Sequence, residues 1–154
     1  MGLDMYLYAL PKKSKIESLK DFDDLYDKAD ARGDDEYFEV WAQWRKANAI
    51  HGWFINHCKC IEENTLYEVT QEDILQLVGT CVNVLLNKEK AGKCLPVCQG
   101  CFFGDYEYDA WYEHDLMQTI EFLGHALSMN WGCKKVKGEE TSTELRKFYY
   151  YASW

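Results

Sequence analysis

Three polar residues of complementary chemistry stand close together in the segment Trp41–Phe54, WAQWRKANAIHGWF. Arg45 carries a guanidinium group that pairs with phosphate or carboxylate, Asn48 carries an amide, and His51 carries an imidazole that exchanges a proton near neutral pH. Wound as a helix, the segment places the three residues on adjoining turns. The pattern indicates a pocket for an anionic group, with Arg45 as the anion ligand and His51 as donor or proton acceptor.

The same residues also have a structural interpretation. On the expected helix, His51 falls within the apolar side and Asn48 at its edge, while Trp53 and His57 point away. Buried polar groups need hydrogen-bond partners, so the two side chains would then tie the helix to backbone groups of a neighbouring sheet. Gly52 would let another backbone or a ligand approach closely, at a helix-propensity cost of roughly 1 kcal/mol. The sequence leaves both interpretations open.

An aromatic segment over residues 102–112 is the second candidate region. Tyrosine and tryptophan dominate binding hot spots and stack on bases, so Tyr106, Tyr108 and Trp111 are candidate ligand contacts. The segment would then form a lid over the polar residues described above. The alternative is that it packs over the edge of the sheet as part of the core.

The chain contains seven cysteines, and their thiolates are possible metal ligands. Cys94, Cys98 and Cys101 have the C-x3-C-x2-C spacing of radical enzymes that hold an iron–sulfur cluster, but those enzymes need a large parallel barrel that 154 residues of this pattern do not supply. A zinc site would need a second paired motif, which the sequence lacks. We therefore expect reduced thiols, no metal and no cofactor.

Composition limits the class of partner. The net charge of −9 disfavours direct binding to nucleic-acid phosphates and to anionic membranes, and it favours a basic protein surface. No apolar run approaches the roughly 20 residues of a membrane span. The N-terminal sequence MGLDMYLYAL lacks a basic leader, so we expect a cytoplasmic protein with no signal peptide.

The elements that must position these residues follow from hydrophobic periodicity. Strict alternation predicts strands over residues 2–10 and 36–43, and further strands are expected over 66–69 and 147–154. A capping box of Ser14 and Glu17 predicts a helix to about residue 31, and Thr70 with Asp73 predicts another to about residue 85. A further helix is expected from about residue 109. Residues 134–146 are charged and predict a mobile loop.

These elements predict a single α+β domain over residues 1–154. Its small antiparallel sheet would pair the N- and C-terminal strands and pack against about three helices.

Four stretches of the chain resemble a family of small uncharacterised proteins of bacteriophages and prophages: GLDMYLYA, WAQWRKANAIHGWF, GCFFGDYEYDAWYEHDL and FYYYASW. The resemblance spans nearly the whole length, and the run RKANAIHGWF is its most specific part. Family members read LP-x-x-x-GFFFG where this chain has cysteine at position 101, so the cysteines look like a local departure. The family itself supplies no function, but small, acidic accessory proteins of phages often act against host factors or host immunity, and this class-level analogy suggests such a role here.

Three functional hypotheses follow. The first is a non-catalytic inhibitor that binds a basic host protein, as an anti-CRISPR protein would, in the cytoplasm of the bacterial host. The second is a binder of a phosphate-containing ligand, such as a nucleotide immune signal, at Arg45, Asn48 and His51. The third is a hydrolase at the same site, because a histidine beside a carboxylate can act as a general base. No serine–histidine–acid, phosphate-loop or HExxH pattern supports catalysis.

Overall fold

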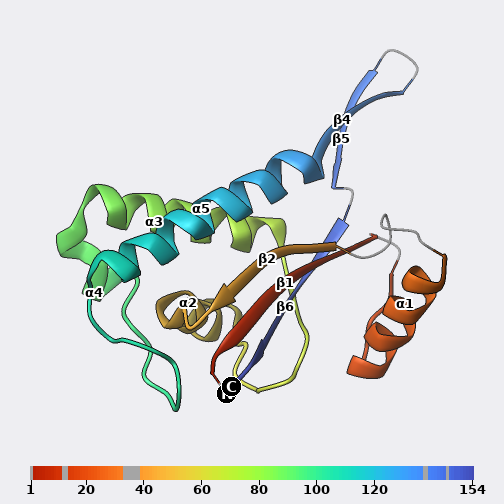
Figure 1. Ribbon diagram of the computed structural model, residues 1–154. Coiled ribbons are helices and arrows are strands. Elements are labelled where there is room, and N and C mark those ends of the chain that lie inside the picture. Colours follow the sequence, from red (N-terminus) through yellow and green to blue (C-terminus); the bar gives the residue numbers. More distant parts are fainter. Residues whose placement is uncertain (1, 12–13, 33–38, 137–138, 145) are drawn as a thin grey trace.

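The computed structural model describes residues 2–11, 14–32, 39–136, 139–144 and 146–154 (Figure 1). Its main sheet has the strand order β2-β1-β6-β3, and every pairing in it is antiparallel. The strands are β1 (Asp4–Pro11), β2 (Glu39–Arg45), β3 (Tyr67–Val69) and β6 (Arg146–Ser153). β1 pairs with β6 along its whole length, so the predicted α+β fold with paired terminal strands is confirmed.

Four longer helices accompany this sheet: α1 (Leu19–Arg32), α2 (Asn48–Cys58), α3 (Gln71–Leu86) and α5 (Ala110–Asn130). A 3-10 turn (Lys88–Lys90) and the short α4 (Ala91–Cys94) follow α3. In Figure 1, α3 and α5 run side by side, and α1 stands apart from them across the sheet. The described ranges contain no helix with the length and apolar composition needed to cross a bilayer.

Alternation along β1 explains this arrangement. Met5 and Leu7 are fully buried on one face of the sheet, the same face on which Tyr150 of β6 stacks against Phe54 of α2. The opposite face carries tyrosines, and the ring of Tyr8 lies 4.8 Å from that of Phe22 in α1. Helices therefore pack against both predicted faces of this strand, the aliphatic face and the tyrosine face.

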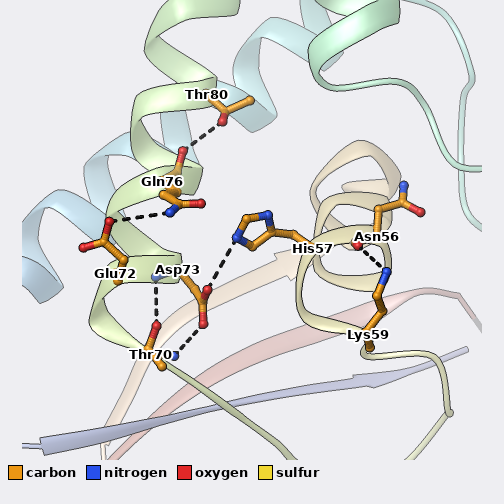
Figure 2. Close-up of polar contacts among 8 residues, drawn as sticks. All are labelled: Asn56, His57, Lys59, Thr70, Glu72, Asp73, Gln76 and Thr80. Atoms are coloured by element: carbon orange, nitrogen blue, oxygen red, sulfur yellow. Dashed lines mark hydrogen bonds and ion pairs between the residues drawn. The ribbon is translucent and has the colours of Figure 1, made fainter.

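Two helix starts test the predicted capping boxes. The Thr70 hydroxyl accepts from the Asp73 N–H at 3.1 Å, and the Asp73 carboxylate accepts from the Thr70 N–H at 2.8 Å, so this box is confirmed (Figure 2). The box at Ser14 is wrong, because α1 begins at Leu19. The start of α1 is capped instead by Asp21, whose carboxylate accepts from the Ser18 N–H at 2.9 Å. The same Ser-x-x-acid spacing occurs twice in succession there.

The predicted loop over residues 134–146 is also wrong for the described residues of this range; residues 137, 138 and 145 lie outside them. β4 (Trp131–Val136) and β5 (Glu139–Glu144) pair antiparallel in a separate two-stranded sheet that extends beyond the end of α5 (Figure 1). The sequences WGCKKV and EETSTE carry polar residues at successive positions. Without apolar alternation, the usual sequence signal of a strand is missing.

Candidate binding site

A cavity of about 360 Å³ opens where the end of β2, the start of α2 and the start of α5 meet residues 97–109. Its charged lining consists of Arg45, Lys46, Asp105, Glu107, Asp109 and Asp115. Carboxylates therefore outnumber basic side chains, four to two.

The junction between β2 and α2 sets one wall of this cavity. Arg45 is the last residue of β2 and Asn48 is the first residue of α2, so the predicted helical face shared by Arg45, Asn48 and His51 is wrong. Between them, Lys46 adopts a left-handed φ of 60°, and its N–H donates to the Leu3 carbonyl at 2.7 Å. This conformation turns the chain sharply from the sheet into the helix.

Asn48 holds the opposite wall in place. Its Nδ2 donates to the carbonyls of Phe103 at 3.2 Å and Asp105 at 2.7 Å, and its Oδ1 accepts from the Cys98 N–H at 3.0 Å. The side chain is 4% exposed. The amide therefore ties α2 to a loop, where the structural interpretation expected a sheet, and its donors are already used by the protein itself.

His51 lies away from the cavity. It is fully buried, and its Nδ1 is 2.7 Å from the Tyr150 hydroxyl. Its ring also packs edge-on against Phe103 and Trp154, and its Nε2 has no hydrogen-bond partner among the described residues. Burial lowers the pKa of His51 to about 4, so the imidazole is neutral at pH 7. The structure thus places this histidine in the core and outside the lining of the cavity.

Arg45 faces solvent at the rim of the cavity. Its side chain is 67% exposed, and its guanidinium lies 3.9 Å from the Asp4 carboxylate. An exposed ion pair of this length contributes little to stability. Arg45 is therefore free to reorient towards a ligand, which is the part of the predicted anion site that the structure leaves possible.

Of the three candidate aromatic residues, Tyr106 and Tyr108 hold the loop and Trp111 lines the cavity. The Tyr106 hydroxyl donates to the Gly100 carbonyl at 2.7 Å, and the Tyr108 hydroxyl accepts from the Val97 N–H at 3.3 Å. Both tyrosines thereby fix the loop. Trp111 lines the cavity with its side chain 73% exposed, so it is the aromatic candidate that a ligand can reach.

The cavity carboxylates differ in how they are paired. Asp109 caps α5 by accepting from the N–H groups of Trp111 at 3.0 Å and Tyr112 at 3.1 Å. The carboxylate of Asp115 has no hydrogen bond or ion pair with any residue that the structure describes. Burial raises the pKa of Asp115 to about 6; the neighbouring His114 lowers this pKa, and the nearby Asp109 charge raises it, each by less than burial does. A half-buried, unpaired carboxylate in a cavity is typical of a binding site.

Sequence reasoning missed Asp115, although a signal was present. Asp115 follows Trp111 by four residues in α5, and residues with this spacing lie on one face of a helix. Because Trp111 was already a candidate, a search of the expected helix for acidic residues on the same face would have identified Asp115.

The cysteine loop packs against α2. A Cβ on Gly52 would lie 2.9 Å from the Cys98 Cβ, so the close approach predicted at this glycine is made by the protein's own chain. Cys94 ends α4, and Cys101 is exposed. Within the described part of the chain, no three His, Cys, Asp or Glu side chains are arranged to hold a metal ion.

Comparison with known proteins finds no matching family model, no matching curated protein and no matching solved structure. Function must therefore be argued from the cavity itself.

Proposed function

We propose that this protein is a non-catalytic binding protein that captures a basic side chain of a protein partner in the cavity between β2 and α5. The observation that carries the proposal is the half-buried Asp115 carboxylate, which has no hydrogen-bond or ion-pair partner among the described residues and shares the cavity with the exposed indole of Trp111. A guanidinium group would pair with the carboxylate and lie against the indole face. Both interactions strengthen when the partner's surface excludes water.

The charge of the whole chain supports the same partner. A net charge of −9 attracts a basic protein over long range and raises the rate of encounter. The lining of the cavity is acidic as well, because four carboxylates face two basic side chains there. We therefore expect a target with a basic, arginine-bearing surface.

The resemblance to bacteriophage proteins suggests the class of target. A nuclease of a host defence system has a basic nucleic-acid groove, and an acidic protein that docks there would block it. On this proposal the chain acts in the bacterial cytoplasm as an anti-CRISPR-like inhibitor, and it needs neither catalysis nor a cofactor.

The proposal is tested by titrating the full-length protein with a short arginine peptide and following the Trp111 indole N–H by NMR. The matched peptide carries citrulline, which keeps the shape of arginine but not its charge. We expect binding of the arginine peptide, and a loss of at least tenfold in affinity, about 1.4 kcal/mol, with Asp115→Asn. Equal binding of both peptides, or unchanged affinity in the variant, would contradict the proposal.

A phosphate-containing ligand is the second candidate. Arg45 and Lys46 border the cavity beside Trp111, so they could pair a nucleotide phosphate while the indole stacks on its base. The excess of carboxylates opposes this ligand. Ligand-induced thermal stabilisation by a nucleotide panel, lost in Arg45→Ala, would favour it over the basic side chain, and turnover of a nucleotide would indicate a hydrolase.

A further inference from the structure

Opposite charges line the cavity between β2 and α5 without pairing. Both basic residues, Arg45 and Lys46, come from the end of β2 and the turn that follows it. The carboxylates come from the loop before α5 and from α5 itself. Within the described part of the chain, neither basic side chain forms an ion pair with a carboxylate of the cavity; Arg45 pairs instead with Asp4, which does not line it. The cavity therefore has a basic part and an acidic part that do not neutralise each other.

The two basic side chains end beside the same point. A Cβ on Gly2 would lie 3.1 Å from the Cε of Lys46 and 3.9 Å from Nη2 of Arg45. The ammonium group is one bond beyond Cε, so it and the guanidinium are close neighbours. Like charges at such a separation repel each other, and an anion placed beside both would be attracted by both. This pair of cations therefore favours an anionic group at the basic part of the cavity.

Two glycines hold the side chain of Lys46 in this position. Its stem lies against Gly2 and also against Gly104, where a Cβ would be 3.0 Å from the Cβ of Lys46 and 3.6 Å from its Cδ. A side chain at either glycine would displace the stem. The N–H of Lys46 donates to the Leu3 carbonyl at 2.7 Å, which fixes the backbone from which the stem leaves. Lys46 thus lines the cavity in a defined position, and it has no ion pair with any residue that the structure describes.

We propose that the cavity binds a C-terminal arginine, a residue that carries both a guanidinium and a free carboxylate. The guanidinium pairs with Asp115 and lies against the indole of Trp111, and the carboxylate lies beside Arg45 and Lys46. Capture of a chain end through its carboxylate is an established mode of peptide recognition. This inference rests on the proposed function and narrows the partner to a protein or peptide that ends in arginine.

The volume of the cavity suits a whole residue. At about 360 Å³ it lies within the range of roughly 300–1,000 Å³ that is typical of pockets for small ligands. A guanidinium alone would leave the two cations without an anion, whereas a terminal arginine satisfies both parts of the cavity. An internal arginine presents a neutral peptide carbonyl there, and hydrogen bonds to a neutral acceptor are about half as strong as those to a charged one. The carboxylate therefore provides selectivity for the chain end.

The test measures the affinity of the full-length protein for four related peptides by isothermal titration calorimetry. The first is Ala-Gly-Gly-Arg with a free carboxylate, and the second is its C-terminal amide. The third is extended by two glycines after the arginine, and the fourth is the free acid with citrulline in place of arginine. We expect the first peptide to bind about tenfold more tightly than each of the other three.

Two lysine variants assign the effect of the carboxylate. Lys46→Gln removes one of the two cations and should reduce the difference between acid and amide to about threefold or less. Lys59→Gln is the matched control, because Lys59 has the same left-handed φ of 60° and carries the same charge but does not line the cavity. It should keep the full difference. The comparison of acid and amide in the wild type decides the question even if Lys46→Gln does not fold.

The possible outcomes separate this inference from the proposed function. Equal affinities for acid and amide, with weaker binding of the citrulline peptide, would overturn the chain-end assignment and leave the captured arginine in place. Equal affinities for arginine and citrulline peptides, or no binding of any peptide, would contradict the proposed function as well. Free arginine should bind more weakly than the peptide acid, because its ammonium group would lie beside Arg45 and Lys46. Binding of free arginine as tight as that of the peptide would overturn the assignment to a chain end.

Discussion

Single side chains shape the cavity and the core behind it. Asn48 makes three hydrogen bonds to backbone groups that lie 50 to 57 residues later in the sequence. His51, one turn further on, is sealed in the core against Tyr150. The sequence identified both residues as unusual on an apolar helix, but the choice between ligand and structural role depended on partners that no local pattern reveals.

Replacing Asn48 with Asp should destabilise the protein strongly. The carboxylate cannot donate to the carbonyls of Phe103 and Asp105, and it would lie buried against them. We expect a loss of about 2–4 kcal/mol in the free energy of unfolding, measured in urea. Asn56→Asp, an exposed position of the same helix, is the matched control and should cost less than about 1 kcal/mol. Similar losses in both variants would show that Asn48 does not tie the loop.

His51 should make stability depend on pH. Its pKa is about 4 in the folded protein and near the ordinary 6.5 in the unfolded chain, so the unfolded state binds the proton more readily. The free energy of unfolding should therefore be unaffected above pH 6.5 and fall by about 3 kcal/mol as the pH drops towards 4. The measurement compares wild type with His51→Gln across this range. Parallel curves for the two proteins would contradict the assignment.

At the scale of elements, a loop over residues 95–109 is positioned by α2 and β2. Gly104 has a φ of +96°, and a Cβ there would meet the Lys46 Cβ at 3.0 Å. Side-chain bonds from Tyr106, Tyr108 and Asn48 complete the attachment. The loop therefore forms a fixed wall of the cavity.

Gly104→Ala should loosen this wall and destabilise the protein by about 1–3 kcal/mol, because both the left-handed backbone and the contact with Lys46 oppose a side chain. Gly79→Ala is the matched control. Gly79 lies in α3 with no atom within 4 Å of an added Cβ, so alanine should stabilise the helix by about 0.5–1 kcal/mol. Thermal unfolding of both variants checks the opposite signs. Two shifts of the same sign would contradict the described loop contact.

The elements themselves were predictable to different degrees. α3 carries a confirmed cap and a clear apolar stripe, and the tyrosine-bearing alternation of β1 identified a strand. The β4–β5 hairpin was missed because its strands lack apolar alternation. The left-handed Lys46 was missed because nothing in its residue type marks a positive φ, and this one residue moves Arg45 from the helix to the sheet.

At the scale of the molecule, an acidic chain presents a cavity in which carboxylates predominate. If a basic partner docks there, rim charges should speed association, and Asp115 should set the affinity. Raising the salt concentration should therefore slow the rate of association with an arginine-bearing partner, measured by surface plasmon resonance. An association rate that does not change with salt would contradict the role given to charge.

The most direct test of the central claim is the affinity for the arginine peptide at pH 7.5 and at pH 5, in wild type and in Asp115→Asn. Arginine stays charged at both pH values, whereas Asp115, with a pKa of about 6, is mostly protonated at the lower one. Binding should thus be roughly tenfold weaker at pH 5 in wild type, and this difference should vanish in the variant. An affinity that is the same at both pH values, or that changes equally in the variant, would show that Asp115 does not hold the basic group.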